Sequence, residues 1–494
     1  MLTELIVALD VGTTSVRALL YDTRGQALGP RTSRPTPLST TPDGGAEVDA
    51  DQLVDAVLGC LEDLAPAASA GRIAAVATCT FWHSLLGLDD AGRPLTPVYT
   101  WADTRSERDA RALRRRLDEP AVHARTGCHF HSSYWPAKLA WLRRTRPRLF
   151  RRVRRWVSPA EYLYLRLCGD ACCSLSMASG TGLFNHARAD WDDELLEALG
   201  LDRSQVATMV DLDMAHARVL ASWRRRLGWL AGALWLPALG DGACNNVGSG
   251  CIGRERLALM VGTSGAIRLL LPGEEVVAPW GLWCYRADRR RCLVGGAISN
   301  GGNLYSWLGR TLQLPSGEEL ERGLAALPPD GHGLTVLPFL AGERNPGYAT
   351  GATATISGLR WHTQPLQILQ ACLEAAGYRL ALIYERLAHL AAPEAVFVAS
   401  GAGLLQSPAW MQMLADILGR RIVMGGEAEA SSRGAALLAA EVLGYGDIAA
   451  GAMPAAGRSC EPDPERHARY REGLQRHRRL YRWLLGGKSL PGAP

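Results

Sequence analysis

Lysine is almost missing from this chain. Among 494 residues only Lys138 and Lys488 are lysines, and nearly all the other basic residues are arginines. This scarcity excludes a P-loop nucleotide site, because that motif needs a lysine directly after its glycine-rich turn. The run at residues 486–489 imitates the end of the motif, but Arg482 stands where its first glycine is required. A nucleotide would therefore have to be held by turns rich in glycine and hydroxyl residues.

Patterns of disulfides and bound metals are missing as well. The 12 cysteines contain no C-x-x-C pair. Neither the adjacent Cys172 and Cys173 nor the pair His129 and His131 has further ligands at the usual spacing. We therefore expect reduced, mostly buried cysteines and no structural zinc.

The chain also lacks the features of membrane and nucleic-acid-binding proteins. No stretch approaches the roughly 20 apolar residues of a membrane span, and the N-terminus has no basic leader. The net charge of +5 is modest, and proline and apolar residues interrupt the densest arginine run, residues 143–155. This pattern favours a solvated surface over nucleic-acid binding. We expect a cytoplasmic protein whose partner is a small molecule, with no nucleic acid and no membrane.

A short phrase is present twice. Residues 9–17 read LDVGTTSVR, and about 250 residues later residues 260–268 read MVGTSGAIR, each between apolar runs that predict strands. Small residues let backbone N–H groups approach phosphate oxygens, and hydroxyls add donors, so two such turns indicate a nucleotide in a cleft. Each turn alone is also compatible with an ordinary β-turn. Asp10 corresponds to Met260, which predicts a divalent-cation ligand in the first turn only.

Strands and helices alternate along the chain, which indicates an α/β protein of two large domains. The boundary is expected near residue 250, with domains over residues 1–250 and 251–455 and a C-terminal helix and tail over residues 456–494. The patterns predict a hairpin over 4–22, a helix over 51–64, a strand over 73–79, a strand over 291–294 with a turn at Gly295 and Gly296, a helix over 365–390, a strand over 395–399, a turn over 400–403 and a helix over 409–418.

An aspartate flanked by glycines lies at this boundary, within the run LGDGACNNVGSG at residues 239–250. Phosphoryl transfer to an alcohol needs a group that orients the hydroxyl and accepts its proton, and an aspartate can do this. The same pattern is typical of an Asp-Gly turn whose aspartate caps a helix. The spacing alone leaves both interpretations of Asp241 open.

Taken together, these motifs resemble the FGGY family of carbohydrate kinases, within the actin-like ATPase superfamily, over nearly the whole chain. The resemblance implies two actin-like (ribonuclease H-like) ATPase domains around a central cleft, with ATP as substrate and Mg²⁺ near Asp10, held through water. It also implies Asp241 as the catalytic base, and it leaves a homodimer open. The implied ATP and phosphate contacts are Gly12, Thr13, Thr14, Ser15, Arg17, Gly262, Thr263, Ser264, Gly401, Ala402 and Gly403.

The family pattern is completed by Gly248 and Gly250 after the aspartate and by the run EASSRGAA at residues 429–436. One departure is visible, because Ala402 stands where related sequences usually have a second glycine. A methyl group is a small addition, so we expect slightly altered contacts with the base and retained ATP binding.

Two loops of the first domain occupy places where the family contacts its sugar, namely residues 80–85 and 100–105. They supply the substrate-binding candidates, beside Asp241 itself: Trp82, His83, Trp101, Asp103 and Arg105. Aromatic faces pack on sugar C–H surfaces, while the polar side chains bond hydroxyl groups. Ordinary core packing is the alternative for both tryptophans, and a satisfied interior position is the alternative for His83.

Several phrases, including residues 100–105 and 178–183, are most similar to the gluconokinase branch of the family. The expected reaction is phosphorylation of D-gluconate to 6-phosphogluconate, with the carboxylate paired by Arg105, His83 or Lys138. A pentulose, as in xylulokinases, is the alternative within the family. A non-catalytic sugar-sensing ATPase is the alternative from another class, against which the presence of Asp10 and Asp241 argues. Residues 342–346 are interpreted as support for the cleft.

Overall fold

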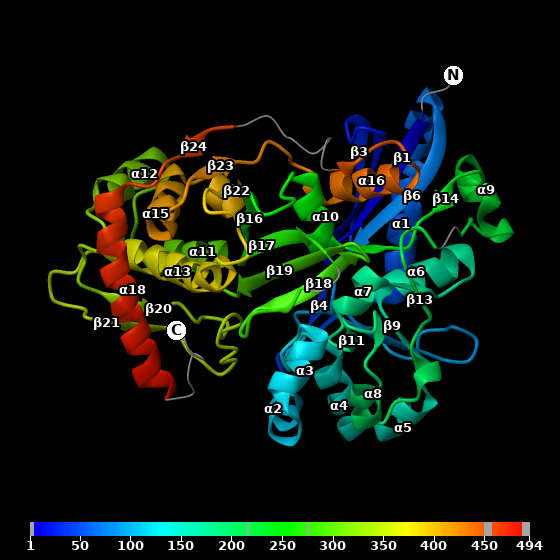
Figure 1. Cartoon of the computed structure of the whole chain (residues 1–494), viewed down its shortest axis with the longest axis horizontal. Helices are drawn as coiled ribbons and strands as arrows, with labels where there is room; N and C mark the ends of the chain where they lie inside the picture. Colours follow the sequence, from blue (N-terminus) through cyan, green and yellow to red (C-terminus); the bar gives the residue numbers. More distant parts are fainter. Residues whose placement is uncertain (1–3, 215–216, 274–275, 449–456, 487–494) are drawn as a thin grey trace.

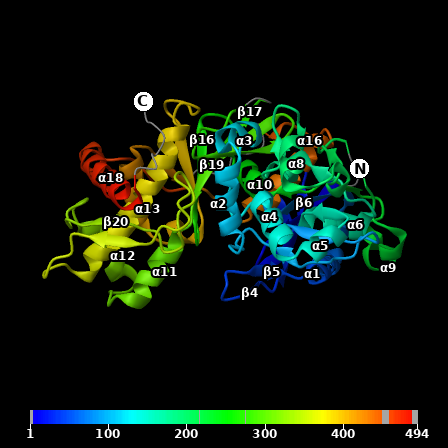
Figure 2. The ribbon, with the colours of Figure 1, turned by 90° about the horizontal axis from the view of Figure 1, so that it is seen from below.

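A computed structural model describes residues 4–214, 217–273, 276–448 and 457–486. Two lobes lie side by side, each built on one large sheet with helices packed against it (Figure 1). A second view, turned by 90°, shows the same division (Figure 2). The Lys488 run of the tail lies outside the described residues.

The first lobe is organised by a six-stranded sheet in the order β14-β6-β1-β2-β3, with β15 also paired to β6. Strand β1 is antiparallel to β2 and parallel to β6, so the predicted hairpin and the strand after it are confirmed. The strands are β1 Glu4–Val11, β2 Ser15–Asp22, β3 Ala27–Pro35, β6 Arg72–Thr80, β14 Leu234–Trp235 and β15 Leu239–Gly240.

Residues 5–9 of strand β1 form an unbroken apolar run because both faces of this sheet are covered. Leu5 and Val7 belong to the core that includes helix α1, Ala50–Leu64, whereas Ile6 and Ala8 belong to the core that includes helix α16, Ala430–Val442. Asp49 caps α1 by accepting hydrogen bonds from the next turn. The predicted helix over residues 51–64 is thus confirmed.

The second lobe repeats this strand order. Its seven-stranded sheet runs β18-β19-β17-β16-β22-β23-β24. Strand β16 is antiparallel to β17 and parallel to β22, as β1 is to β2 and β6. The strands are β16 Arg256–Val261, β17 Gly265–Pro272, β18 Trp283–Asp288, β19 Arg291–Ile298, β22 Val396–Ser400, β23 Ile422–Met424 and β24 Ser459–Cys460. The repeated phrase in the sequence therefore marks two sheets of like topology.

The predicted turn at Gly295 and Gly296 is wrong, because both residues lie inside strand β19. Glycine is required at both positions because neighbouring groups leave no room for a side chain, and not because the chain bends there. A Cβ on Gly295 would lie 2.9 Å from the Trp283 ring, and one on Gly296 would lie 2.9 Å from Ile383. A missing side chain in a strand often marks such a close approach.

The remaining elements fill the faces and the periphery of the two sheets. The helices are α2 Glu107–Arg116, α3 Glu119–Thr126, α4 Trp135–Thr145, α5 Pro147–Arg152, α6 Pro159–Cys168, α7 Leu175–Ser179, α8 Asp193–Leu199, α9 Arg224–Leu227, α10 Asp241–Gly248, α11 Gly302–Thr311, α12 Gly317–Ala326, α13 Pro365–Leu387, α14 Ala402–Leu405, α15 Pro408–Leu418 and α18 Pro464–Leu485. The helices predicted over 365–390 and 409–418 are confirmed as α13 and α15. Short strands are β4 Ser39–Thr40, β5 Ala46–Val48, β7 Leu86–Leu88, β8 Val98–Tyr99, β9 Arg155–Val157, β10 Cys173–Ser174, β11 Phe184–Asn185, β12 Asp190–Trp191, β13 Met209–Val210, β20 Thr335–Leu337 and β21 Thr355–Ser357.

Helix α16 comes late in the chain but packs in the first lobe, against α10, β1 and β6 (Figure 1). Two glycines allow the close approach of α10 and α16. A Cβ on Gly248 would lie 1.8 Å from the carbonyl oxygen of Ala430, and one on Gly434 would lie 1.8 Å from that of Cys244. The chain therefore crosses back to the first lobe after the second sheet is complete.

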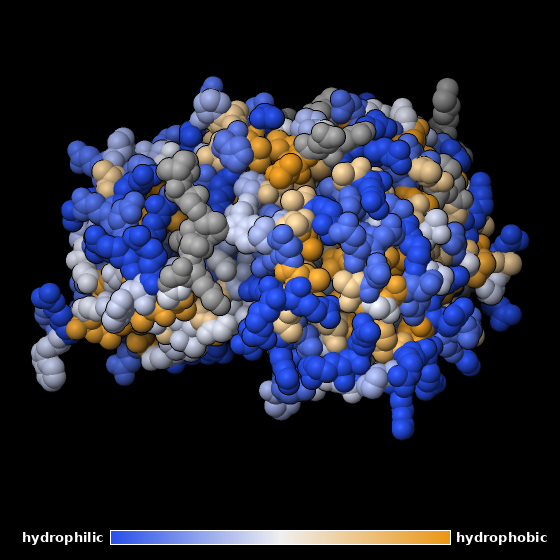
Figure 3. All heavy atoms as spheres, turned by 60° about the horizontal axis from the view of Figure 1, so that its bottom comes forward, coloured by the Kyte–Doolittle hydropathy of each residue, from blue (hydrophilic) through white to orange (hydrophobic). Residues whose placement is uncertain are grey.

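No helix in the described part of the chain is long and apolar enough to cross a membrane. On the face shown in Figure 3, hydrophilic residues predominate and apolar atoms occur in separate groups.

Candidate active site

The two glycine-containing turns occupy the same place in the two lobes. Each turn closes a hairpin, at the end where β1 and β16 finish. The N–H of Gly12 donates to the Ser15 carbonyl at 2.9 Å, and that of Gly262 donates to the Ser264 carbonyl at 2.9 Å. Open α/β sheets place ligands beyond the carboxyl ends of their parallel strands. Both turns lie at such an end, because β1 and β16 run parallel to β6 and β22.

The second turn is fixed from two sides. The N–H of Gly302, at the start of α11, donates to the Gly262 carbonyl at 2.7 Å. On the other side, Gly401 has φ +91°, and a Cβ there would lie 2.5 Å from the carbonyl oxygen of Val261. Only glycine meets both demands at position 401. The small residues expected to serve adenosine therefore also hold the phosphate turn in place, while Ala402 begins helix α14.

A cavity of about 630 Å³ opens beside this turn. Helices α11, α12 and α14 and the start of α15 supply its walls, and the lining residues are Gly302, Tyr305, Ser306, Gly317, Glu318, Glu321, Arg322, Gly403, Gln406, Ser407 and Pro408. The volume lies within the range of small-molecule and cofactor sites. Of the three predicted adenosine contacts, Gly403 lines the cavity.

A second cavity, of about 150 Å³, brings residues of the two halves of the chain together. Its lining residues are Phe81, Trp82, His83, Trp101, Asp241, Gly242, Met260, Ser264, Ala266, Arg268, Trp283, Tyr285, Ala297 and Arg344. Four predicted substrate residues, Trp82, His83, Trp101 and Asp241, thus line the same cavity as Ser264 of the second glycine-containing turn. This turn lies between the two cavities, because Gly302 of the larger cavity bonds to its first residue.

Asp241 is the first residue of helix α10 and lines the smaller cavity. The N-cap residue is Gly240, and no side-chain cap hydrogen bond is formed there, so the interpretation of Asp241 as a helix-capping residue is wrong. The Asp241 carboxylate accepts a hydrogen bond from the Gly242 N–H at 2.7 Å. Burial and the nearby charge of Asp10 raise the pKa of Asp241 to about 6, and Arg268 opposes that rise. Asp241 is thereby a carboxylate at neutral pH with a heightened affinity for a proton, as a general base requires.

Asp10 lies buried at the end of β1, where its carboxylate pairs with Arg17. Arg17 also reaches Glu429, at the start of α16, at 3.1 Å. Burial raises the pKa of Asp10, and the Arg17 guanidinium opposes the rise. Asp10 and Asp241 lie close enough for their charges to interact, so a cation beside them would relieve the repulsion.

Glycines around Asp241 make room for the Trp82 indole. A Cβ on Gly240 would lie 1.7 Å from Trp82 Cε2, and one on Gly242 would lie 2.8 Å from Trp82 Cζ3. Gly240 has φ −73°, which any residue adopts, so space is the reason for glycine there. The indole N–H donates to the Ser176 carbonyl at 2.9 Å. Because Gly240 and Gly242 flank Asp241 and both contact Trp82, the position of Asp241 depends on the position of the Trp82 ring.

His83 has φ +68°, an uncommon conformation for a residue with a side chain. Such strain is often found at functional sites. Burial lowers the pKa of His83 to about 3, so the imidazole is neutral. Its Nδ1 bonds to the Gly180 carbonyl and must carry the proton, because a carbonyl only accepts. Nε2 is left as an acceptor for a hydroxyl group.

Asp103, Arg105 and Lys138, the remaining candidates for substrate contacts, do not line either cavity. Arg105 pairs with Asp103 and with Glu47, and its side chain is only 10 % exposed. Lys138 is buried and donates to backbone carbonyls, including that of Ser132 at 2.9 Å. Burial lowers the pKa of Lys138 to about 7. These groups shape the loops behind the cavity.

Arg344 and Arg268 line the smaller cavity, although neither was identified from the sequence. The interpretation of residues 342–346 as support needs correction. Glu343 does support the interior, through an ion pair with Arg379 in which both side chains are 1 % exposed. Arg344, the next residue, lines the smaller cavity, and its buried Nε has no hydrogen-bond partner in the described residues. Within residues 342–346, Glu343 is buried and Arg344 lines the smaller cavity. The residue types alone do not show which of the two charged side chains reaches the cavity.

Two lobes of like topology, with a turn of small residues in each and cavities beside them, define an actin-like architecture. Residues 5–248 match the FGGY family of carbohydrate kinases, N-terminal domain, and residues 257–442 match its C-terminal domain. The solved gluconate kinase and ligand-bound xylulose kinase from Lactobacillus acidophilus superpose with TM-scores of 0.90 and 0.91, each at 28 % identity over 98 % of this chain and 99 % of the other.

Comparison of sequences gives the same result. The gluconokinase of Bacillus subtilis is 26 % identical, over 88 % of this chain and 87 % of its own. The xylulose kinase of Streptomyces rubiginosus is 30 % identical, over 90 % and 89 %. The chain belongs to the FGGY family of carbohydrate kinases. It is a sugar kinase, the family uses ATP, and the predicted two-domain actin-like fold is confirmed.

Proposed function

We propose that this protein phosphorylates a sugar acid, D-gluconate, on its terminal hydroxyl to give 6-phosphogluconate and ADP. The observation that carries the proposal is Arg344, which lines the same cavity as Asp241 and whose buried Nε has no hydrogen-bond partner in the described residues. An anionic substituent would supply that partner by a charge-assisted, bidentate hydrogen bond. Neutral His83 and the engaged Arg105 and Lys138 offer no such free charge.

The proposed reaction uses Asp241, the two glycine-containing turns and the larger cavity. Asp241 accepts the proton of the sugar hydroxyl as the oxygen attacks the γ-phosphorus, and the bond to the β-γ bridging oxygen breaks to release ADP. The turns at residues 12–15 and 262–264 present N–H and hydroxyl donors to the phosphates, and the larger cavity takes the base. Mg²⁺, held through water beside Asp10, would neutralise charge on the transferring phosphate.

The sugar would be oriented by the walls of the smaller cavity. Trp82 and Trp101 offer aromatic faces to C–H groups, and Nε2 of His83 accepts from a hydroxyl. Trp101 is 38 % exposed, so it lies at the rim of the cavity and would be covered when substrate binds. In this proposal the carboxylate end of the substrate binds Arg344 and the reacting hydroxyl lies beside Asp241.

Xylulose is the second candidate substrate, since xylulose kinases and gluconokinases are both relatives of this chain at similar identity. A neutral ketose leaves Arg344 without a charged partner, which is why we favour a sugar acid. A sugar-sensing ATPase without kinase activity would have no use for Asp241 as a base. Cytoplasmic location and a homodimer belong to the same proposal.

The test compares D-gluconate with D-glucitol, which has the same length and lacks the carboxylate. Sugar-dependent ADP release from Mg·ATP is measured for the wild type, for Arg344→Gln and for Arg24→Gln, an exposed control. A hydrogen bond to a charged group contributes about 1.5–3 kcal/mol. Arg344→Gln should therefore lower kcat/KM for gluconate by about 10- to 150-fold and leave D-glucitol and D-xylulose unchanged. Equal loss with all three substrates, or a wild type active only on xylulose, would refute the assignment of gluconate.

A further inference from the structure

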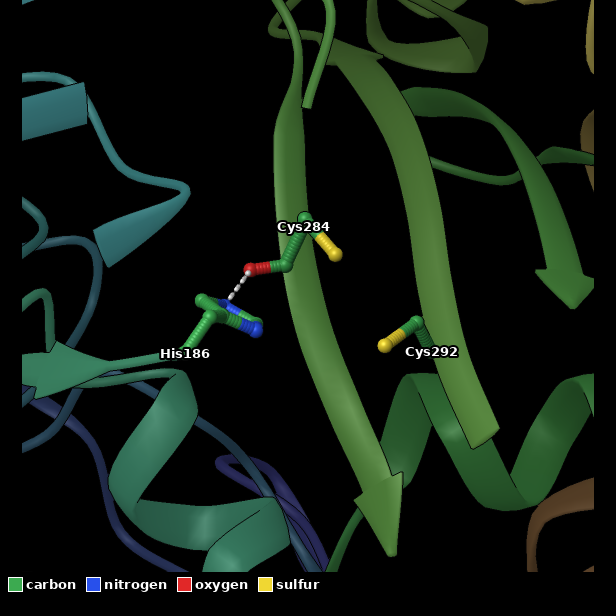
Figure 4. Close-up of side chains that lie close together, drawn as sticks. All are labelled: His186, Cys284 and Cys292. Atoms are coloured by element: carbon green, nitrogen blue, oxygen red, sulfur yellow. Dashed lines mark hydrogen bonds between the residues drawn. The ribbon is translucent and has the colours of Figure 1, made fainter. Parts of the chain in front are cut away.

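A histidine from the first half of the chain meets two cysteines from the second-lobe sheet, and none of the three lines either cavity. His186 follows strand β11, Cys284 lies on β18 and Cys292 on β19. One ligand atom of each residue lies within 4.8 Å of those of the other two. In Figure 4 the His186 ring approaches from one side of β18, and the two sulfur atoms point into the same space from neighbouring strands.

The register of the strands explains why both thiols face this space. Cys284 pairs with Val294 and Arg286 pairs with Cys292 in the antiparallel ladder. Side chains two residues apart share a face of a strand, so Cys284 and Cys292 are diagonal neighbours on one face. The Cys292 thiol donates to the Gly273 carbonyl at 3.6 Å, a weak contact that a metal bond can replace.

The hydrogen bonding of His186 leaves one ring nitrogen ready to bind a metal. Nε2 lies 3.2 Å from the Cys284 carbonyl oxygen, and a carbonyl accepts only, so Nε2 carries the proton. Nδ1 then has a lone pair, and this atom is buried with no hydrogen-bond partner in the described residues. Metal-binding histidines commonly donate their other N–H to a backbone carbonyl in this way.

We propose that His186, Cys284 and Cys292 form a site for a thiophilic divalent cation, of which Zn²⁺ is the representative. Zn²⁺ prefers thiolate and imidazole ligands in tetrahedral geometry. Binding releases the two thiol protons to solvent and forms two Zn–S bonds and one Zn–N bond, and water takes the fourth position. His186 is half-buried, which leaves a path for the ion.

The site would tie the two halves of the chain together beside the substrate cavity. His186 belongs to the segment 184–186, whereas Cys284 lies between Trp283 and Tyr285, which both line the smaller cavity. A bound ion would hold β18 against that segment. The consequence is a gain in thermal stability that needs all three ligands, because an ion that binds only the folded protein stabilises it.

A second group of metal-ligand residues serves as the internal control. Asp330, His332 and Glu374 also lie within 4.8 Å of one another. His332 Nε2 already bonds to Glu374 at 2.9 Å, and Asp330 pairs with Arg476. With its members engaged, this group should not compete for zinc.

The experiment is a zinc titration of the full chain against a chromogenic chelator, with Co²⁺ substitution to detect thiolate-to-cobalt charge-transfer absorption. We expect one Zn²⁺ to bind per chain. Cys284→Ser, Cys292→Ser and His186→Gln should each weaken zinc binding by more than about 10- to 100-fold, which is the usual cost of losing a residue that only hydrogen-bonds to a metal ligand. Cys168→Ser and His332→Gln are the controls and should bind as the wild type does. Zinc should raise Tm in the wild type and not in His186→Gln.

Two results would overturn the proposal. One is the absence of a zinc equivalent in the wild type, and the other is binding that persists in all three ligand variants or is lost in His332→Gln. Should a cysteine variant fail to fold, His186→Gln decides the question alone, because its side chain is half-buried and lies outside the second-lobe sheet.

Discussion

Replacing Gly240 by alanine should disturb the active site through the Trp82 indole. The added Cβ would lie 1.7 Å from Trp82 Cε2, whereas carbon atoms in contact need about 3.5–4.0 Å. The buried ring must therefore move by about 2 Å. Overpacking of this kind costs about 1–3 kcal/mol, and the hydrogen bond from the indole to Ser176 is worth about 1 kcal/mol more.

Catalysis should suffer as well as stability, because Asp241 is the next residue and the indole is a wall of its cavity. A displacement of about 1 Å in a catalytic arrangement can cost about 100-fold in rate. Gly232→Ala is the matched control, since a Cβ at Gly232 meets nothing within 4 Å. Urea unfolding and kcat/KM for the preferred sugar are measured for both variants.

A double-mutant cycle isolates the contact. Trp82→Leu removes the ring, so Gly240→Ala should cost less in that background, with a coupling energy of about 1–3 kcal/mol. The reasoning is refuted if Gly240→Ala unfolds at the urea concentration of Gly232→Ala and keeps full activity. It is equally refuted if the two substitutions at the site are strictly additive.

Three further predictions concern other parts of the structure. With the pKa of Asp241 raised to about 6, kcat/KM should be level above that pH and fall tenfold per unit well below it as the base is protonated; a flat profile down to about pH 5 would exclude Asp241 as the titrating base. Gly434→Ala places a Cβ 1.8 Å from the Cys244 carbonyl oxygen, so helices α10 and α16 must separate and unfolding should become easier by about 1–3 kcal/mol or more; unchanged urea unfolding would count against that packing. Glu343→Gln leaves buried Arg379 without its charge partner and should cost about 3–5 kcal/mol, measured by denaturant unfolding, and a cost below about 1 kcal/mol would contradict the burial of the pair.

The hairpins, the principal helices and the place of Asp241 could be predicted because their signals are local. A turn of small residues between two apolar runs is readable from about fifteen neighbouring positions. The return of α16 to the first lobe was not readable in this way. This packing requires a glycine at position 434, where the backbone approaches Cys244. The residues around Gly434 do not indicate a contact with Cys244, and the residues around Cys244 do not indicate a contact with Gly434. The turn predicted at Gly295 and Gly296 was wrong for the same reason, since Trp283 and distant Ile383, and not a bend, require small residues there.

The residues of the smaller cavity show the same difference between local and distant signals. Trp82, His83 and Trp101 were identified from their loops, and they line it together. Arg105 has equal chemistry in the sequence, yet Glu47 and Asp103 engage it. Arg344 stands in a segment interpreted as support, and only the fold brings it to Asp241. The sequence shows the charge of an arginine but not whether an acidic partner lies near it, and this difference separates Arg105 from Arg344.

The most direct test of the account is Asp241→Asn, because the variant keeps the size of the side chain and removes its basicity. Sugar phosphorylation should fall by about 10²- to 10⁴-fold, while calorimetric binding of Mg·ATP stays within about threefold of the wild type, a difference of less than 1 kcal/mol. Retention of most turnover would remove Asp241 from the role of base. A matching loss of ATP binding would show that Asp241 holds the nucleotide and does not activate the sugar.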